Sequence, residues 1–239
     1  MPERSWLILN LEAPLLSFGG VTIDAIGVTR DFPSLSMLTG LFANALGWRR
    51  TQWEEHQALQ DRLIFAARRE RENPSGLLTD TQNVNLEKND RGWTTWGGVE
   101  KRGGDSYGGP HRRFRDYHMD ARVSLAVRLE SSPDGPDLDH LAEALDRPKR
   151  PLFIGRKTCL PTGRVVGGFI TAKNAYEALE KSPLPEETRA LWPLGEGPAE
   201  GQCVDRVIDL PDLRNWRTGL HGGARKVVEG RIAPQRTTP

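Results

Sequence analysis

The 239-residue chain is predicted to adopt an α+β fold in which the order strand, helix, strand occurs twice around an insertion. Three observations carry this prediction. Residues 32–48 are uncharged and have the apolar spacing of a helix, residues 122–129 alternate as in a half-buried strand, and the glycine-rich residues 73–110 have no apolar period. Nearly forty residues without a core face are too many for a simple connection, which favours an inserted arm.

The first half of the fold is predicted from three segments in order. Residues 6–11, WLILNL, are apolar on both faces and indicate a buried strand. Residues 32–48 follow as a helix, and after a linker containing Trp48 and Trp53, residues 62–69, RLIFAARR, indicate a second strand. Strand, helix, strand in this order is the opening half of a ferredoxin-like unit.

The helix within 32–48 is expected to pack deeply, with Ser34 or Ser36 as N-cap and Gly47 as C-cap. Its second face must be approached closely by a backbone, a partner or an anion, because it lacks the charges of a solvated face. That face carries Ser36, Gly40, Ala43 and Asn44. Arg30 and the free amides expected at the helix start would suit a phosphate, whereas the plainer interpretation is a capped core helix.

Residues 73–110 are interpreted as a projecting arm or hairpin. Exposed aromatic rings among cations would suit stacking on nucleobases, and the alternative is a loose hairpin whose tryptophans dock on the parent domain. The side chains in question are Trp93, Trp96 and Tyr107, with Lys88, Arg91, Lys101 and Arg102.

The second half begins with the strand at 122–129, RVSLAVRL. A short helix capped by Asp137 follows, and a closing strand is expected at 165–171. Further elements are expected as a helix at 174–181 capped by Asn174, a helix over EETRALW, a strand at 204–210 and a disordered tail after Ile232.

These elements predict a ferredoxin-like (RRM-like) βαββαβ domain with an inserted β-hairpin thumb and a smaller, β-rich C-terminal region. The domain is expected at 1–72 and 111–172, the thumb at 73–110 and the C-terminal region at 173–239.

Composition restricts the function class. A net charge of +1 argues against a protein that coats nucleic acid indiscriminately, yet the clusters at 111–115 and 147–157 are strongly basic. They suggest a defined track for a polyanion, unless the arginines are merely scattered on solvated faces. A mean hydropathy of −0.55 and the lack of a membrane-length apolar run predict a cytoplasmic protein without membrane contact.

No cofactor or metal is expected. Cys159 and Cys203 show neither CxxC pairing nor histidines at ligand spacing, so they are interpreted as buried thiols. The short matches to a metal-site pattern, Asp137 with Asp139 and His118 with Asp120, have plainer interpretations at a helix start and a strand entrance.

Four segments resemble, in the same order, the motifs of one family. LNLEAPLLSFG resembles its opening strand and turn, TRDFPSLSMLTGLFANALGW its PSxSG helix start, RDYHMDARVSLAV its RxYxxDAxFxV strand, and PLFIGRKTCLP its PxYLGRKSCPP loop. The family is the repeat-associated mysterious proteins of CRISPR systems, and the similarity is to the CasD-type subunits of type I-E Cascade. Leu35, Met37 and Phe153 depart from the usual basic residue, glycine and tyrosine of these motifs.

The resemblance implies a non-catalytic, RNA-binding subunit of a ribonucleoprotein complex in antiviral defence. Such a subunit caps the 5′ handle of the guide RNA, contacts the backbone and large subunits of Cascade, and reaches target DNA only indirectly. The residues expected to bind RNA are Arg30, Ser34, Ser36, Arg112, Arg113, Arg115, Tyr117, Lys149, Arg150, Phe153, Gly155, Arg156 and Lys157.

Two other function classes stay open. A metal-independent endoribonuclease would need a base such as a histidine, for which His118 is the best candidate although no partner is fixed by spacing. A protein-docking module would use the small-residue helix face and the loops around WPLGEGPAEG.

Overall fold

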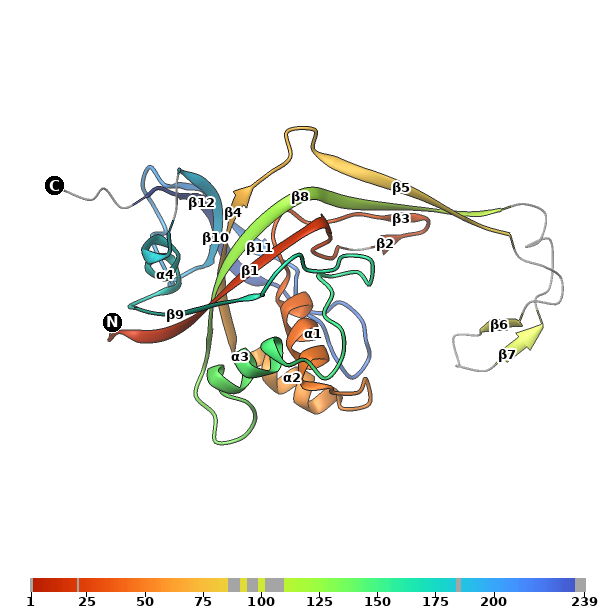
Figure 1. Ribbon diagram of the computed structural model, residues 1–239, viewed down its shortest axis with the longest axis horizontal. Helices are drawn as coiled ribbons and strands as arrows, with labels where there is room; N and C mark the ends of the chain where they lie inside the picture. Colours follow the sequence, from red (N-terminus) through yellow and green to blue (C-terminus); the bar gives the residue numbers. More distant parts are fainter. Residues whose placement is uncertain are drawn as a thin grey trace.

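The computed structural model describes residues 2–20, 22–85, 91–93, 99–101, 110–183 and 186–234. Over these ranges the chain has an α+β fold built on one large, mostly antiparallel sheet (Figure 1). No helix in the described part of the chain is both long and apolar enough to cross a membrane.

Seven strands form the main path of the sheet, in the order β11-β12-β10-β4-β8-β1-β9. β8 lies between β1 and β4 and is antiparallel to both, with Leu9 opposite Leu125 and Phe65 opposite Val127. The strands are β1 (Arg4–Leu16), β4 (Leu63–Arg71), β8 (His111–Leu129), β9 (Val166–Ala172), β10 (Thr188–Pro193), β11 (Val204–Leu210) and β12 (Arg225–Ile232).

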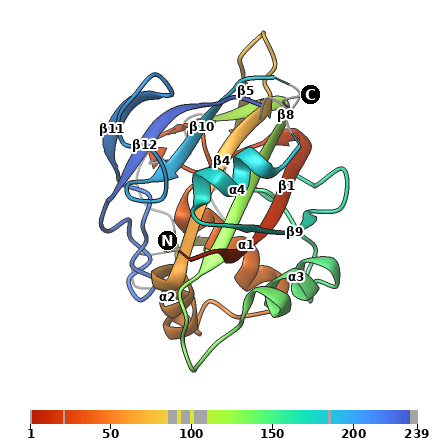
Figure 2. The same ribbon diagram turned by 90° about the vertical axis from the view of Figure 1, so that its left-hand side faces the viewer.

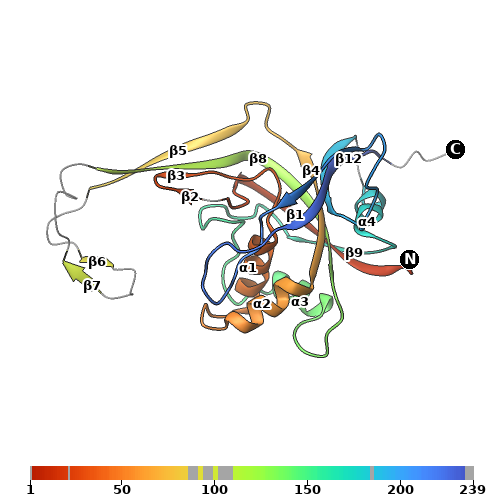
Figure 3. The same ribbon diagram turned by 180° about the vertical axis from the view of Figure 1, so that it is seen from behind.

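An arm extends the sheet to one side of the molecule (Figures 1 and 3). The first half of β8 leaves the core and pairs with β5 (Leu77–Val84), and β3 (Ile26–Gly27) runs parallel to β8 at the base. β2 (Thr22–Ile23) pairs with β3, while β6 (Arg91–Trp93) and β7 (Val99–Lys101) form a separate two-stranded sheet.

Helices cover both faces of the sheet. α1 (Leu35–Leu46), α2 (Trp53–Arg62) and α3 (Leu138–Asp146) pack on one face, and α4 (Ala175–Lys181) packs on the other (Figure 2). The alternation along β1 explains the two cores, because Leu7 and Leu9 face the three helices while Trp6 and Ile8 face α4. The largely apolar 6–11 segment is therefore confirmed as a strand with buried residues on both faces.

Most of the expected elements are confirmed, with two exceptions. Ser34 is the N-cap of α1 and Gly47 is its left-handed C-cap, while Asp137 and Asn174 cap α3 and α4 through their side chains. The helix expected over EETRALW is wrong, because this segment forms β10 between β4 and β12. The linker expected at Trp53 is in fact the start of α2.

The expected arm interior falls largely outside the described residues, including Lys88, Trp96, Arg102 and Tyr107. The expected tail is described only as far as Pro234. The strand expected at 122–129 is longer than predicted, since β8 begins at His111.

Candidate nucleic-acid interface

The cations of the arm lie on the outer half of β8. Arg112 and Arg113 are exposed; among the described residues, Arg112 donates to the Asn83 side chain and Arg113 donates to the Arg112 carbonyl. Arg115 is partly buried and donates to the carbonyl oxygens of Ala25 and Phe114, at 3.1 and 2.9 Å. Arg112 and Arg113 are thus available to a ligand, whereas Arg115 holds the β2–β3 hairpin against β8.

Arg156 fastens the basic loop 147–157 to the base of the arm. Its guanidinium donates to the carbonyl oxygens of Asp116 on β8 (2.7 Å) and Gly27 on β3 (2.9 Å). It also lies 4.7 Å from the centre of the Tyr117 ring, a cation–π distance. The structure therefore brings Tyr117 and Arg156 together, although Tyr117 is buried.

Gly155 is required by the packing of this loop. Its φ is +84°, and an added Cβ would lie 1.6 Å from the carbonyl oxygen of Ser17, just after β1. Residues other than glycine are strained at such a φ, and here they would also collide with backbone. The close backbone approach expected at Gly155 is made to the protein's own chain, and its contact with RNA stays a prediction.

The other end of the loop is attached to the C-terminus of α1. Arg150 donates to the carbonyl oxygens of Gly47 (2.8 Å) and Trp48 (2.9 Å), where the helix dipole is negative. Asn44 donates from Nδ2 to the Pro151 carbonyl. The loop's backbone therefore covers the small face of α1 only at Asn44, while Gly40 faces the ring of Trp216 and Ser36 lies against Asp212.

Two lysines of the loop remain exposed after these attachments. Within the described residues, the ammonium groups of Lys149 and Lys157 have no hydrogen bond or ion pair. Phe153, which lies between them in sequence, is partly buried. Lys149 lies by the end of α1, and Lys157 lies by the arm. The loop therefore presents one exposed cation near each of its two attachment points.

The start of α1 is already occupied by an acid. The carboxylate of Asp212 accepts from the Leu35 amide at 2.9 Å, and its carbonyl accepts from the Ser36 amide at 3.2 Å. Arg225 neutralises this buried carboxylate at 3.0 Å. The expectation of free amides is therefore wrong, because a carboxylate from a distant loop takes the place of an external anion.

Arg30, Ser34 and Ser36 surround this helix start. The Oγ of Ser34 accepts from the Met37 amide and lies 3.2 Å from the Oγ of Ser36. Arg30 donates to the Pro211 carbonyl at 2.8 Å. Binding of these three side chains to RNA stays a prediction, and they are engaged within the protein.

His118, the candidate base, is buried and has both ring nitrogens bonded. Arg69 can only donate, so Nδ1 accepts from it at 3.2 Å and Nε2–H donates to the Arg30 carbonyl at 2.8 Å. Burial lowers the pKa of His118 below its ordinary value, and the charge of Arg69 lowers it further, against the opposing effect of the bond to Arg30. Both ring nitrogens of His118 are therefore engaged by groups of the protein itself.

Metal-ligating side chains do not gather in the described part of the chain, where no three His, Cys, Asp or Glu residues could hold an ion together. Cys159 is a buried thiol, as expected, and burial raises its pKa, while Cys203 is only partly buried.

Sequence reasoning missed Asp212, Arg225 and Arg69, since no local pattern marks residues whose partners are distant in sequence.

Comparisons with known proteins agree on one family. The model of the family described as CRISPR-associated protein (Cas_Cas5) matches residues 6–228. The CRISPR system Cascade subunit CasD of Escherichia coli (strain K12) is 28% identical over 176 residues, covering 74% of this chain and 76% of that protein.

Two solved structures have a similar fold. One is titled as a CRISPR RNA-guided surveillance complex, with 22% identity, a TM-score of 0.65 and coverage of 97% of this chain and 95% of the matched chain. The other, described as a crystal structure of a Cas protein, has 22% identity, a TM-score of 0.59 and coverage of 98% and 97%. The family match spans nearly the whole described chain, so this protein belongs to the Cas5 family of CRISPR-associated proteins.

Proposed function

We propose that this protein is a non-catalytic subunit of a Cascade-type CRISPR surveillance complex in the cytoplasm, and that it holds the 5′ handle of the guide RNA. The observation that carries the proposal is the attachment of the basic loop to the arm through Arg156. This attachment holds the exposed cations of the loop next to those of β8. Membership of the Cas5 family and similarity to a protein named as a Cascade subunit support guide RNA as the polyanion.

The proposed fold is a ferredoxin-like unit made from β1, α1, β4, β8, α3 and β9. Support comes from the strand order β4-β8-β1-β9, in which each neighbouring pair is antiparallel, and from α1 and α3 lying on one face. The arm interrupts this unit between β4 and β8, and the C-terminal strands extend the sheet beside β4. On this basis we propose the divisions at 1–72 with 111–172, 73–110 and 173–239, with the first half of β8 continuing from the domain into the arm.

The proposed RNA path runs along the loop and onto the arm. Lys149 and Lys157 supply free ammonium groups, and Arg112 and Arg113 continue the positive charge outward along β8. Cations of this kind bind phosphates whatever the base sequence, so they position the backbone of the RNA. Phe153 supplies a ring for stacking on a base.

A salt series of RNA affinity tests this path. The protein is titrated with a fluorescent RNA carrying the 5′ handle at several salt concentrations, for the wild type, K149A and K157A. Each loss of one phosphate contact should weaken binding and lower the salt slope by about 0.7 to 0.9. K173A is the matched control, because Lys173 is an exposed lysine near α4 on the other face of the sheet. Equal slopes for all four proteins would overturn the proposed path.

The arm is proposed to pass between the guide and neighbouring backbone subunits of the complex. All but one of the β5 residues are exposed, so within this strand little area is buried by the protein itself. Replacement of residues 78–107 by a short linker should prevent assembly with the backbone and large subunits, and thereby target DNA binding. Unchanged assembly on size-exclusion chromatography would contradict this role.

The endoribonuclease alternative has a direct test in the same samples. We expect the purified chain to leave repeat RNA intact, and the H118A variant to behave like the wild type. Cleavage by the wild type that is lost in a folded H118A variant would replace the proposed function by catalysis.

A further inference from the structure

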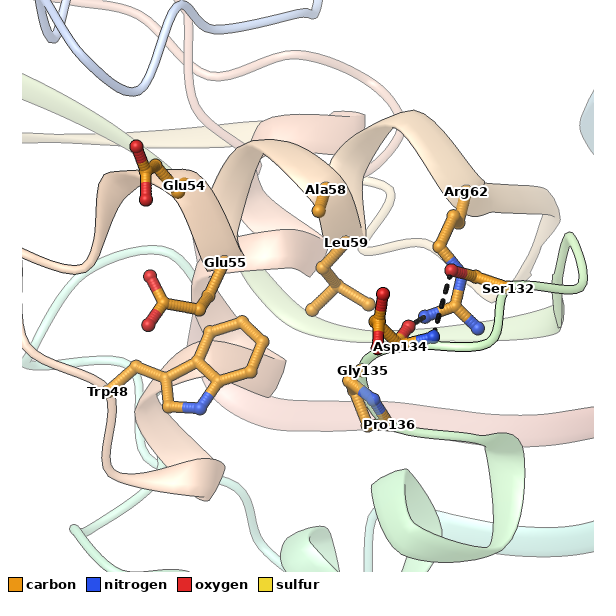
Figure 4. A pocket seen from close by; sticks show the side chains of 10 residues that line it. All are labelled: Trp48, Glu54, Glu55, Ala58, Leu59, Arg62, Ser132, Asp134, Gly135 and Pro136. Atoms are coloured by element: carbon orange, nitrogen blue, oxygen red, sulfur yellow. Dashed lines mark hydrogen bonds between the residues drawn. The ribbon is translucent and has the colours of Figure 1, made fainter.

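A cavity of about 600 Å³ lies between α2 and the loop that follows β8 (Figure 4). Leu59 and Trp48 give it an apolar floor, and Pro136 lines the facing wall. Leu59 is almost fully buried in the main core, so the floor is fixed by the packing of α2 on the sheet. A volume of this size accommodates several side chains.

The rim of this cavity is acidic. Glu54 and Glu55 lie on the first turn of α2, and Asp134 lies on the opposite wall. Within the described residues, the carboxylates of Glu54 and Asp134 have no hydrogen bond or ion pair, and the carboxylate of Glu55 accepts only from Gln52, at 3.1 Å. Three carboxylates thus face solvent around an apolar floor.

The one cation that lines the cavity is used by the protein itself. Arg62 donates to the carbonyl oxygens of Glu130 and Asp134, at 2.9 and 3.2 Å. Gly135 permits this contact, since its φ is +92° and an added Cβ would lie 2.9 Å from a guanidinium nitrogen. The wall is therefore held in shape by Arg62, whose hydrogen bonds do not neutralise the carboxylates.

A second cavity, of about 390 Å³, continues from the first. The two share Arg62 and Ser132, and the second also presents Asp137, Asp139 and the exposed ring of Phe169. We call the combined surface the acidic groove. It is long, and each of its two halves presents both apolar and acidic side chains. Such a surface suits an extended chain better than a small molecule.

We propose that the acidic groove docks a segment of a partner protein in which arginine or lysine residues flank an apolar side chain. The apolar side chain packs on Ala58 and the edge of the Trp48 indole, above the buried Leu59, and a cation reaches Glu55 and the face of the indole beside it. The same carboxylates repel RNA, so the groove and the basic loop bind different partners. The inference rests on the proposed function, because it requires that the chain belongs to an assembly.

Charge reversal in the reconstituted complex tests the inference. The chain is co-expressed with its partner subunits and guide RNA, and assembly is measured for the wild type and for the E55K/D134K double variant. We expect the double variant to lower the affinity for the partner at least tenfold while its RNA affinity and melting temperature stay unchanged. E200K is the matched control, because Glu200 is an exposed acid far along the chain with no ion pair among the described residues.

A photo-crosslinker at Ala58, an exposed position in the groove, identifies the occupant. We expect an adduct with a protein segment containing lysine or arginine, absent when the crosslinker is placed at the exposed Ala199. An adduct with RNA, an adduct with an acidic segment, or no adduct in an assembled complex would each overturn the inference. Failure of the wild type to assemble at all would instead overturn the proposed function on which it rests.

Discussion

The carboxylate of Asp212 lies 2.9 Å from the amide nitrogen of Leu35, so the first turn of α1 is capped from a loop 177 residues further along the chain. The same carboxylate is fully buried and pairs with Arg225. Removal of one partner from a buried ion pair leaves the other charge uncompensated, which costs more than the pair contributes.

We expect D212A to lower the free energy of unfolding by about 3 to 5 kcal/mol, and D212N to lower it by less, because an amide oxygen still accepts from Leu35. Urea denaturation measures both. D209A is the control: Asp209 forms an exposed pair with Lys226, for which a change of about 0 to 1 kcal/mol is expected. A D212A protein as stable as D209A would contradict the capping role.

G155A should be strongly destabilising. The left-handed φ would contribute about 1 to 3 kcal/mol of strain, and the collision with the Ser17 carbonyl would add about 1 to 3 kcal/mol through displacement of the loop. Thermal unfolding should show a clearly lower Tm than for G163A, since Gly163 has open space around it. Equal melting temperatures would show that the loop does not depend on this approach.

Arg156 and Lys157 are adjacent, yet their substitutions should have different effects. R156A loses the hydrogen bonds to Asp116 and Gly27 and should reduce stability by about 1.5 to 3 kcal/mol. K157A should stay within about 0.5 kcal/mol of the wild type in stability, while it weakens RNA binding and lowers the salt slope. Chemical denaturation combined with the salt series separates the two; a K157A variant that unfolds as easily as R156A would refute the assignment.

His118 should make stability depend on pH. Its folded-state pKa is depressed below 6.5 by burial, so the unfolded chain binds the extra proton more readily than the folded protein does. The stabilisation is complete above about pH 6.5 and is lost as pH falls from there toward the folded-state pKa. The melting temperature should fall more between pH 7.5 and pH 5.5 for the wild type than for H118Q. An equal fall in both proteins would exclude His118 as the origin of the pH dependence.

Local signals made much of the fold predictable. α1 follows from its apolar spacing, with Ser34 before it and Gly47 after it, and these interactions span only a few residues. α2 was missed because its buried face includes His56 and Gln60, and Gln60 is stabilised by hydrogen bonds with the distant Arg214. Polar residues of that kind give no hydrophobic period.

β10 was misread for a related reason. Residues of TRALWP favour a helix locally, whereas their strand conformation follows from pairing with β12 and β4, far away in sequence. The candidate site shows the same difference between features set by local sequence and features set by distant contacts. The basic loop at 147–157 was visible in the sequence. Its internal attachments were not, because Arg150 and Arg156 donate to the carbonyl groups of Gly47, Trp48 and Gly27, which are far away in sequence.

The continuity of β8 has a mechanical consequence. Asp120, with a positive φ of 41°, lies where the strand passes from the core into the arm, and Arg71 holds its carbonyl and carboxylate at 2.8 and 2.7 Å. From there to His111 the strand spans about 30 Å at roughly 3.3 Å per residue. A rotation of about 10° at Asp120 would therefore shift the outer end by about 5 Å by lever geometry. Because β1 pairs with β8 on both sides of Asp120, at Ala121 and at Met119, the core sheet holds the direction of the strand that carries the arm.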